Sequence, residues 1–481
     1  MERPQQTEVL IRRGHDLVLR GEAEPGEDDV ATVGRRCGQR HLILYDADER
    51  GDLRSELLAR RQDSLELRDP AAPVAKAALF LHMHRFDRRA GEGADAARLQ
   101  VGESLEHGEL RARFLEGHGR DSADGRLTFA RMRIVLADPP AYTPPYDRSL
   151  AAALARAGAD VELVTSRFRF GAVAAPTGYS AREWFYPVSA RMGSSRLRLA
   201  VKALEHPLGM ARLDALKPDV LHVQWLGAVE ADRWLFRPRG PAVFTAHDII
   251  PRRTASKTRL WRVLFDRFDR IVVHSVRGRG QLAEFGVAEN KLRVIPHPTF
   301  RSDVRRADDG RTALCLGLIR PYKGTEDAVE AVLHVDDARL LVVGDPRVPL
   351  EGLRQTAGAR AEWRLGYLPD SELRRALSEA TVALFPYRAE IDVSGALLQV
   401  LGAGVPAIVY DIGGLGEVVG RFAAGAVVPA GDVDAMAAAL ETLLGDAVAL
   451  EAARQGADRA RAELTWEASA EAHLELYREI A

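Results

Sequence analysis

The chain has 481 residues, which is too long for one ordinary hydrophobic core and favours two or three domains. Its formal net charge of -2 excludes an overall attraction to nucleic acid, and its two distant cysteines, Cys37 and Cys315, exclude a disulfide framework and a structural zinc site. No apolar run approaches the ~20 residues of a membrane span, and the N-terminus lacks the layout of a signal peptide. We therefore expect a soluble, cytoplasmic protein.

The first 131 residues differ from the rest of the chain. They contain one lysine, Lys76, and none of the six tryptophans. Periodicity is weak there, apart from HLILYD near residue 41 and AALFLH near residue 77. Residues 1–131 are either an additional domain or upstream sequence translated before a start at Met132. We favour the second explanation, because pattern and composition do not agree as they do in foldable domains.

From Met132 onward the pattern predicts a Rossmann-like domain over residues 132–303. MRIVLADPP begins as a short apolar strand, and the segment SLAAALARAGADVELVTSRF predicts a helix, a turn at Gly158 and a second strand. Further apolar strands are expected at 219–225, 242–248 and 270–275, and each ends in polar residues. Ligands bind at the carboxyl ends of such strands in open α/β sheets.

A second α/β domain is expected over residues 304–465. It follows the charged stretch RSDVRRADDGRT, which is typical of an interdomain linker. Six apolar strands are predicted at 313–319, 339–345, 363–367, 382–387, 406–411 and 425–430. Residues 466–481 predict a closing amphipathic helix with Trp466, Ala470, His473, Leu474 and Tyr477 near one stripe.

Two cations stand at the end of one predicted strand, in GLIRPYKGTEDAVEA (317–331). The strand ends at Ile319, Arg320 and Lys323 follow, and Gly324 permits a tight backbone before a helix begins at Thr325. Arginine offers a planar fork to phosphate oxygens and lysine offers a point charge. The alternative is two solvated cations, and on this motif alone the two explanations are evenly balanced.

A helix start follows in PYRAEIDVSGALLQVLGAGVPAIVYDIGGLGEVV (386–419). Ser394 and Gly395 open this helix, so its free N–H groups and positive dipole end can bind phosphate. Ser394 can also be an ordinary helix cap. Glu390 and Asp392 would repel a diphosphate, so we assign them to sugar hydroxyls. Glu417, after the GG turn, can cap backbone or bind a hydroxyl.

Taken together, these segments resemble glycosyltransferase family 4. The resemblance runs from Met132 to the C-terminus and rests on the segments DVLHVQW, FTAHD, VIPHP, GLIRPYKG, the EID-x-SG helix start, GAGVPAIVYDIGGLGEVV and TWEASAEAHLELYREI. It implies the GT-B fold, in which two Rossmann-like domains face a central cleft and a C-terminal helix crosses back to the N-terminal domain. It also implies a retaining, metal-independent enzyme that moves a sugar from a nucleotide-diphosphate-sugar to an acceptor in glycan or glycolipid synthesis.

The resemblance implies roles for individual residues. Arg320 and Lys323 match the cations that hold the donor diphosphate, and His247 resembles the histidine that donates a hydrogen bond to the transferred sugar. A strand-end histidine that caps a turn with Asp248 is the alternative. The leaving diphosphate would itself take the acceptor's proton, so that no side-chain base is needed. The nucleotide-sugar is a substrate, and no cofactor is expected.

Two positions depart from the family pattern. Gln399 stands where the second of two spaced glutamates should bind the ribose, although it can still hydrogen-bond a hydroxyl. The first loop reads PPAYTPPYD, with Pro144 and Pro145 in place of a glycine pair, which suggests an altered acceptor pocket. We place Tyr146, Asp147 and Asp248 on the acceptor side.

Several other features have simpler explanations. Asp46 and Asp48 imitate a metal-binding DxD, and His82 and His84 could ligate a metal, but neither pair has the surrounding context, so no metal site is expected. Asp432 and Asp434 are expected to start a helix. There are two alternatives to a transferase. One is a nucleotide-sugar epimerase, and the other is a non-catalytic protein that binds nucleotide-sugars, which Gln399 would permit.

A basic run lies within residues 252–270, interleaved with apolar side chains. It could lie on an anionic membrane and bring the enzyme to a lipid-linked acceptor. A solvated helix face with a buried apolar stripe is the commoner explanation. The cations of this run are Arg252, Arg253, Lys257, Arg259, Arg262, Arg267 and Arg270, and its apolar residues are Leu260, Trp261, Val263, Leu264 and Phe265.

Overall fold

The computed structural model describes residues 7–13, 17–23, 43–45, 131–193, 196–388 and 391–481. The chain divides into two units, residues 1–127 and 128–481. In the first unit, an antiparallel sheet has the order β2-β1-β3. Its strands are β1 (Thr7–Arg13), β2 (Leu17–Ala23) and β3 (Ile43–Tyr45), and β3 falls within the expected HLILYD strand. The AALFLH segment, Cys37, Asp46, Asp48, His82 and His84 lie outside the described residues.

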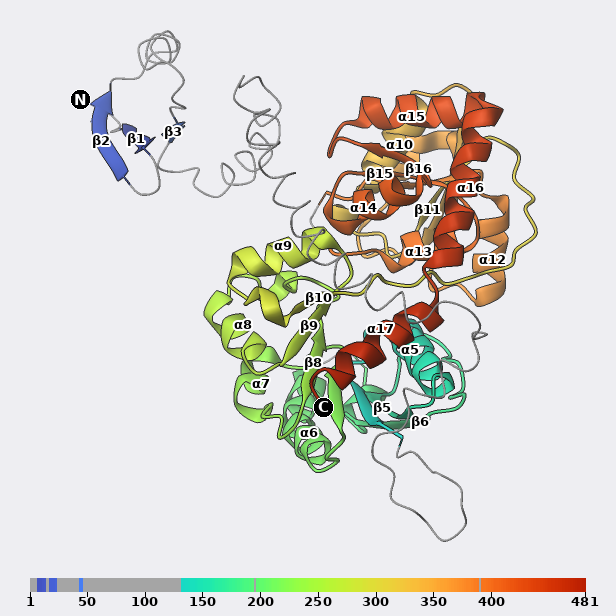
Figure 1. Cartoon of the computed structure of the whole chain (residues 1–481). Coiled ribbons are helices and arrows are strands. Elements are labelled where there is room, and N and C mark those ends of the chain that lie inside the picture. The colour runs from blue at the N-terminus through green and yellow to red at the C-terminus, as the bar shows by residue number, and fades with distance from the viewer. Residues whose placement is uncertain (1–6, 14–16, 24–42, 46–130, 194–195, 389–390) are drawn as a thin grey trace, which may run out of the picture. The chain divides into compact units, whose positions relative to one another are not determined.

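The second unit begins with a seven-stranded parallel sheet of order β10-β9-β8-β7-β4-β5-β6 (Figure 1). We call this sheet and its helices the N-lobe. Buried parallel strands read as continuous apolar runs, which is why most of these strands were predictable. The strands are β4 (Arg133–Asp138), β5 (Asp160–Ser166), β6 (Ser180–Phe185), β7 (Val220–Val223), β8 (Ala242–Thr245), β9 (Arg270–Val273) and β10 (Leu292–Val294).

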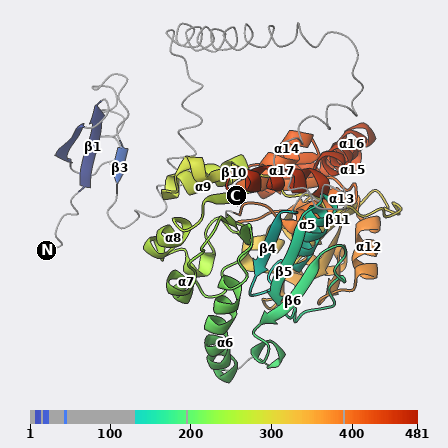
Figure 2. The same cartoon turned by 60° about the horizontal axis from the view of Figure 1, so that its bottom comes forward.

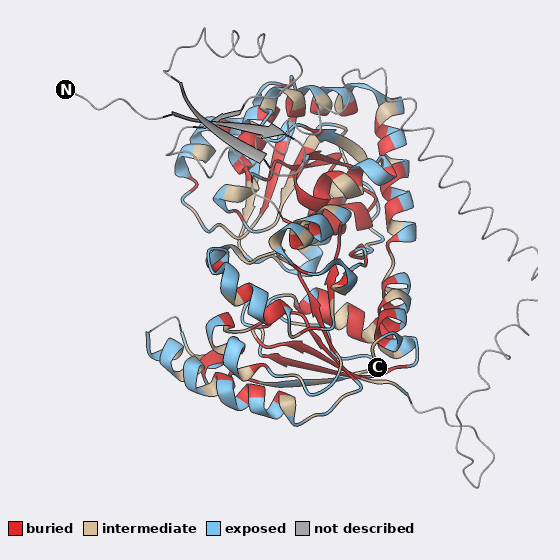
Figure 3. Cartoon of the chain, turned by 60° about the vertical axis from the view of Figure 1, so that its left-hand side comes forward, coloured by how far each residue is buried: buried red, intermediate tan, exposed pale blue. Residues whose placement is uncertain are grey.

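Helices cover both faces of the N-lobe sheet, and Figure 3 shows their buried sides against the strands. The helix after β4 begins at Pro144, earlier than expected, because Pro144 and Pro145 occupy its first turn, where the missing N–H costs nothing. The helices are α5 (Pro144–Arg156), α6 (Arg196–Asp214), α7 (Val229–Leu235), α8 (Thr258–Phe265) and α9 (Val276–Phe285), with short 3₁₀ turns at Ser189–Arg191, Arg252–Thr254 and Glu289–Lys291.

The second half of this unit is the C-lobe, a six-stranded parallel sheet of order β13-β12-β11-β14-β15-β16 with its helices. Figure 2 shows this lobe in a second view. Its strands are β11 (Thr312–Leu316), β12 (Arg339–Gly344), β13 (Ala361–Leu365), β14 (Val382–Phe385), β15 (Ala407–Tyr410) and β16 (Gly425–Val428). Its helices are α10 (Thr325–Leu333), α11 (Glu351–Ala357), α12 (Asp370–Glu379), α13 (Gly395–Gly402), α14 (Gly413–Phe422), α15 (Val433–Gly445) and α16 (Ala447–Glu463), with 3₁₀ turns at Pro321–Lys323 and Gly358–Arg360. Asp432 caps α15, and Asp434 lies in its first turn.

The last helix, α17 (Trp466–Arg478), returns from the C-lobe and packs on the N-lobe (Figure 1). Its residues Ala470, Leu474 and Tyr477 are buried in the same core cluster as β4 and β5. The Tyr477 hydroxyl lies 2.6 Å from Nδ1 of His222 on β7. The expected GT-B architecture, with two Rossmann-like domains and a crossing C-terminal helix, is therefore confirmed.

The basic run at 252–270 contains α8, and the apolar residues of this helix mostly face the core. Trp261, Leu264 and Phe265 are buried, whereas Val263 is 48% exposed. In the described part of the chain, no helix is long and apolar enough to cross a membrane.

Candidate functional site

A lysine, a tyrosine and a serine converge at the start of α13. Ser394 is the N-cap of this helix, and its hydroxyl accepts a hydrogen bond from the Leu397 amide at 3.5 Å. The Tyr387 hydroxyl lies 2.8 Å from that serine oxygen, and Lys323 Nζ donates to the same tyrosine hydroxyl. The Lys323 ammonium also lies 3.7 Å from the centre of the Tyr387 ring. A cation is thus held beside a helix N-terminus, which is a favourable arrangement for phosphate.

The backbone around Gly324 places Lys323 against Tyr387. Gly324 has a φ of +64°, and a Cβ atom there would lie 1.8 Å from the carbonyl oxygen of Pro386. Only glycine permits this close approach between the turn after β11 and the end of β14. Arg320 precedes the same turn and is exposed. The structure therefore brings Lys323 and Ser394 together, as expected, through a tyrosine that the sequence analysis did not identify.

Two carboxylates of the C-lobe bind the start of α9 in the N-lobe. Asp392 is fully buried, and its oxygens accept hydrogen bonds from the His274 amide, at 2.6 Å, and from the Ser275 hydroxyl. Glu417 accepts hydrogen bonds from the Val276 amide at 2.9 Å and from the next amide at 3.2 Å. Both carboxylates therefore connect the lobes here. Asp392 was expected to bind a sugar hydroxyl, and in this structure its oxygens are buried and used elsewhere.

Burial raises the pKa of the Asp392 carboxyl to about 7, against the lowering effect of its hydrogen bond with Ser275. The nearby charge of Glu417 raises the pKa further. This connection between the lobes is therefore built on a carboxyl group that titrates near neutral pH.

His247 lies at the end of β8 in the N-lobe and is half-buried. Its Nε2 atom is 2.9 Å from Oε1 of Gln224, its ring stacks on Trp225 with 5.5 Å between centroids, and Tyr146 contacts it edge-on at 4.7 Å. Burial is the main cause that holds the pKa of His247 well below its usual range. Charge repulsion from His274 and other nearby histidines lowers this pKa further. The imidazole is therefore neutral at neutral pH.

The hydrogen bond to Gln224 determines which nitrogen of His247 carries the proton. With Gln224 Oε1 as acceptor, Nε2 donates and Nδ1 is left as an acceptor. The resemblance implies that His247 donates a hydrogen bond to a sugar. Donation from Nδ1 would require the other tautomer and a reversed Gln224 amide, whose Nε2 atom is buried without a partner among the described residues.

His247 and the start of α13 are connected through the lobe contact. The ring of His274 lies 5.4 Å from the ring of His247, and its amide is bound by Asp392, two residues before Ser394. His247 in the N-lobe and the Lys323–Tyr387–Ser394 group in the C-lobe therefore belong to one contiguous region.

Two of the expected acceptor-side residues are buried. Tyr146 is 2% exposed and packs against His247 and Trp466, so it supports the site from inside the N-lobe. Asp147 is 1% exposed, and burial, together with the neighbouring Asp138, raises its pKa well above the usual range. Asp248 is half-buried beside His247. These placements correct the expectation that Tyr146 and Asp147 offer polar groups to an acceptor.

Two of the remaining expected donor residues lie on α13. Gly395 is exposed at the first position of α13, and Gln399 is half-buried on its second turn. Glu390 lies outside the described residues. Their roles toward a donor stay predictions. Among the described residues, no three His, Cys, Asp or Glu side chains are grouped so that they could hold a metal ion.

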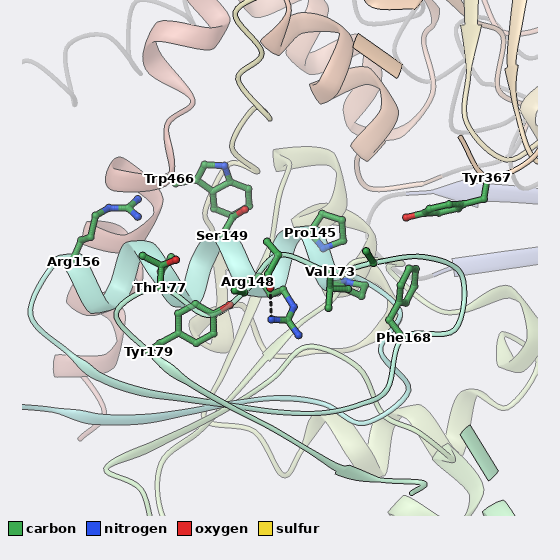
Figure 4. A pocket seen from close by; sticks show the side chains of 15 residues that line it. Pro145, Arg148, Ser149, Arg156, Phe168, Val173, Thr177, Tyr179, Tyr367 and Trp466 are labelled. Carbon is green, nitrogen blue, oxygen red and sulfur yellow. Dashed lines mark hydrogen bonds between the residues drawn. The ribbon is translucent and has the colours of Figure 1, made fainter. Parts of the chain in front are cut away.

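A pocket of about 450 Å³ opens beside α5, and side chains from both lobes line it (Figure 4). Pro145 and Arg148 lie on α5, Phe168 lies in the segment after β5, and Trp466 begins α17. Tyr367 comes from the C-lobe, after β13. The prolines of the first loop therefore line a pocket, although the tyrosine and aspartate that follow them do not.

Comparisons with known proteins match both lobes. Residues 147–299 match the family model described as Glycosyltransferase Family 4, and residues 310–446 match the model described as Glycosyl transferases group 1. The chain is 28% identical over 304 residues to D-inositol 3-phosphate glycosyltransferase of Mycobacterium marinum, a match that covers 54% of this chain and 63% of that protein. The chain thus spans less than two thirds of that relative's length.

Two solved structures share the fold. Sucrose-phosphate synthase from Thermosynechococcus elongatus superposes with a TM-score of 0.60 at 21% identity, covering 73% of this chain and 99% of that one. Anabaena HepE in complex with UDP and glucose superposes with a TM-score of 0.57 at 13% identity, covering 73% and 100% of the two chains.

Proposed function

Because the chain belongs to glycosyltransferase family 4, we propose that it transfers a sugar from a nucleotide-diphosphate-sugar to an acceptor. The observation that carries the proposal is the convergence of Lys323, Tyr387 and Ser394 at the exposed start of α13. The donor diphosphate would lie against the first amides of this helix, with Lys323 and the exposed Arg320 beside it.

The chemistry follows from the charge that develops on the leaving group. Departure of the nucleoside diphosphate concentrates negative charge on phosphate oxygens, and positioned donors stabilise that charge more in the transition state than in the bound substrate. We propose retention at the anomeric carbon, with the leaving diphosphate taking the acceptor's proton on the same face. His247 would then orient the sugar as a neutral imidazole.

Binding of nucleotides tests the donor site directly. A nucleoside diphosphate that binds only the folded protein raises its apparent stability, by about 2.7 kcal/mol at a hundredfold excess over Kd. We expect one of UDP, GDP or ADP to give a thermal shift that the double variant Arg320→Ala/Lys323→Ala loses. HepE binds UDP in its solved complex, which makes UDP the first compound to try. No shift with any nucleotide would refute the donor site.

Hydrolysis of the donor separates the transferase from its alternatives. A slow release of free sugar from the nucleotide-sugar, in the absence of acceptor, is expected of a transferase. Binding without release would favour the non-catalytic binder, and conversion to an isomeric nucleotide-sugar would favour the epimerase. We also propose that no metal ion takes part, so the release should persist in EDTA.

We propose further that the enzyme works in the cytoplasm and contacts an anionic membrane surface through α6, and not through α8. Leu197, Leu204 and Leu208, spaced along one side of α6, are 65%, 75% and 65% exposed. Arg196 and Arg212 are exposed near the two ends of the same helix. An exposed apolar stripe flanked by cations suits the surface of an anionic bilayer.

Vesicle sedimentation tests this contact. Vesicles that contain phosphatidylglycerol should sediment the protein in a salt-sensitive manner, and neutral vesicles should sediment less of it. Leu204→Glu should abolish sedimentation, whereas Val263→Glu, at an exposed position of α8, should not. Equal sedimentation of both variants with the unaltered protein would refute the assignment to α6.

A further inference from the structure

The groove beside α5 is lined mostly by apolar side chains. One wall is the side of α5 formed by Pro145, Ser149, Ala152 and Arg156, and the other is the segment 167–179 after β5 (Figure 4). None of the described residues that line the groove carries a carboxylate. Small aliphatic and aromatic side chains make up most of it, so the groove offers apolar surface that water covers poorly.

The segment 167–179 exposes apolar residues that a solvent-facing loop does not need. Ala172, Ala174 and Ala175 are exposed and line the groove, and the nearby Phe170 is 56% exposed. A cluster of exposed apolar side chains commonly marks a binding surface. Here that surface faces the side of α5.

The two arginines of the groove are already engaged by the protein. Arg148 donates a hydrogen bond to the carbonyl oxygen of Ala174 at 2.7 Å and so ties the segment to α5. Arg156 forms an ion pair with Glu467 at 2.7 Å. Both cations therefore hold the walls in place, and the surface left to a ligand is chiefly apolar.

The groove begins next to the candidate site and runs away from it. Pro144 and Pro145 line its near end and directly precede Tyr146, whose ring contacts His247. Arg156 lines its far end. The helix from Pro145 to Arg156 has twelve residues, and the eleven steps between them correspond to about 16 Å. An occupant of the groove would therefore be elongated, with one end near His247.

The C-lobe also contributes to the near part of the groove. Tyr367 is 58% exposed, its ring lies 6.2 Å from that of Phe168, and a Cβ atom at Gly171 would lie 2.4 Å from it. A residue of the proposed donor lobe thus touches the groove wall, which places the groove where both substrates of a transfer must meet.

From this geometry we propose that the groove between α5 and segment 167–179 binds an elongated apolar chain of the acceptor. The acceptor is accordingly an amphiphile, whose polar end is presented at His247 and whose hydrocarbon chain lies along α5. This inference rests on the proposed function, because it names the class of acceptor for the same site.

Thermal shift with decyl maltoside, used below the concentration at which it forms micelles, tests the groove in the full chain. Maltose alone controls for the sugar head. Ala152→Trp fills the groove from α5, and Ala175→Trp fills it from the exposed opposite wall, where a large side chain should not hinder folding. Ala452→Trp, at an exposed position on α16, is the matched control.

We expect decyl maltoside to stabilise the unaltered protein and the Ala452→Trp variant, and both groove variants to weaken its binding at least tenfold. Maltose should give no shift. Equal shifts in all variants, or no shift in the unaltered protein, would overturn the proposal. Thermal shifts with nucleotides are measured on the same proteins. If these shifts persist in the groove variants, the variants are folded. If no protein shows a nucleotide shift, the proposed donor site fails independently of the groove.

Discussion

Asp392 offers a sharp test of how the two lobes are connected. Its carboxyl is fully buried and accepts hydrogen bonds from the His274 amide and the Ser275 hydroxyl. Burial raises its pKa from the usual 3.8 to about 7. Between these values the folded protein keeps a proton that the unfolded chain releases. The proton on Asp392 therefore contributes to the free energy of unfolding. This contribution is fully present below about pH 4 and is lost as the pH rises to about 7.

The size of this contribution to stability follows from the pKa shift of Asp392. One pKa unit corresponds to about 1.4 kcal/mol, so a shift of about three units amounts to about 4 kcal/mol. Asparagine has the shape of the protonated carboxyl and carries no charge. We therefore expect Asp392→Asn to be more stable than the unaltered protein, and its advantage to grow by about 3 kcal/mol between pH 5 and pH 8.

Urea unfolding at these two pH values measures the difference. Tryptophan fluorescence suits the assay, because all six tryptophans lie in residues 132–481 and report on the two lobes. Asp160→Asn, at an exposed carboxylate, is the matched control for the loss of a charge. An advantage of Asp392→Asn that is equal at both pH values, or a variant that is less stable at pH 8, would refute the reasoning.

Three further substitutions test the region proposed to bind the donor diphosphate. Lys323→Ala should weaken nucleoside diphosphate binding about 10- to 100-fold in a calorimetric titration, because a charge-assisted hydrogen bond is lost. Lys217→Ala, at an exposed position, should leave this binding unchanged. Tyr387→Phe removes the hydroxyl between the lysine and the helix cap, and it should weaken the same binding less than Lys323→Ala does, with little effect on thermal stability. Gly324→Ala should cost more than about 2 kcal/mol in chemical unfolding, because its Cβ meets a backbone carbonyl. Gly286→Ala, at another left-handed glycine whose Cβ would have no atom closer than 3.7 Å, should cost only about 1 kcal/mol.

The parts of the fold that the sequence predicts are those set by local pattern. Strands such as Val220–Val223 and Val382–Phe385 are buried on both faces and read as short apolar runs. Ser180–Phe185 was not predicted, because it is an edge strand in which half of the residues are exposed and Arg182 and Glu183 interrupt the apolar pattern. The start of α5 was missed for a different reason: its prolines suggested a loop, although proline is well suited to a first helical turn.

The candidate site divides in the same way. Ser394 as a helix cap and Lys323 after a strand follow from their immediate neighbours in the sequence. The partners of Asp392 lie more than a hundred residues away, in the other lobe, so no spacing rule could indicate that its carboxyl is buried. Tyr387 could have been found, since it is the last residue of the strand predicted at 382–387, and ligands bind at the carboxyl ends of such strands.

The return of α17 to the N-lobe has a consequence for the order of events during synthesis. Domains usually fold as units, with the N-terminal one first, while the ribosome extends the chain. The N-lobe lacks part of its core, including Leu474 and Tyr477, until the C-lobe has been made. We therefore expect the nascent N-lobe to keep an uncovered apolar strip throughout translation of the C-lobe, and to acquire its full resistance to protease only when the last helix leaves the exit tunnel.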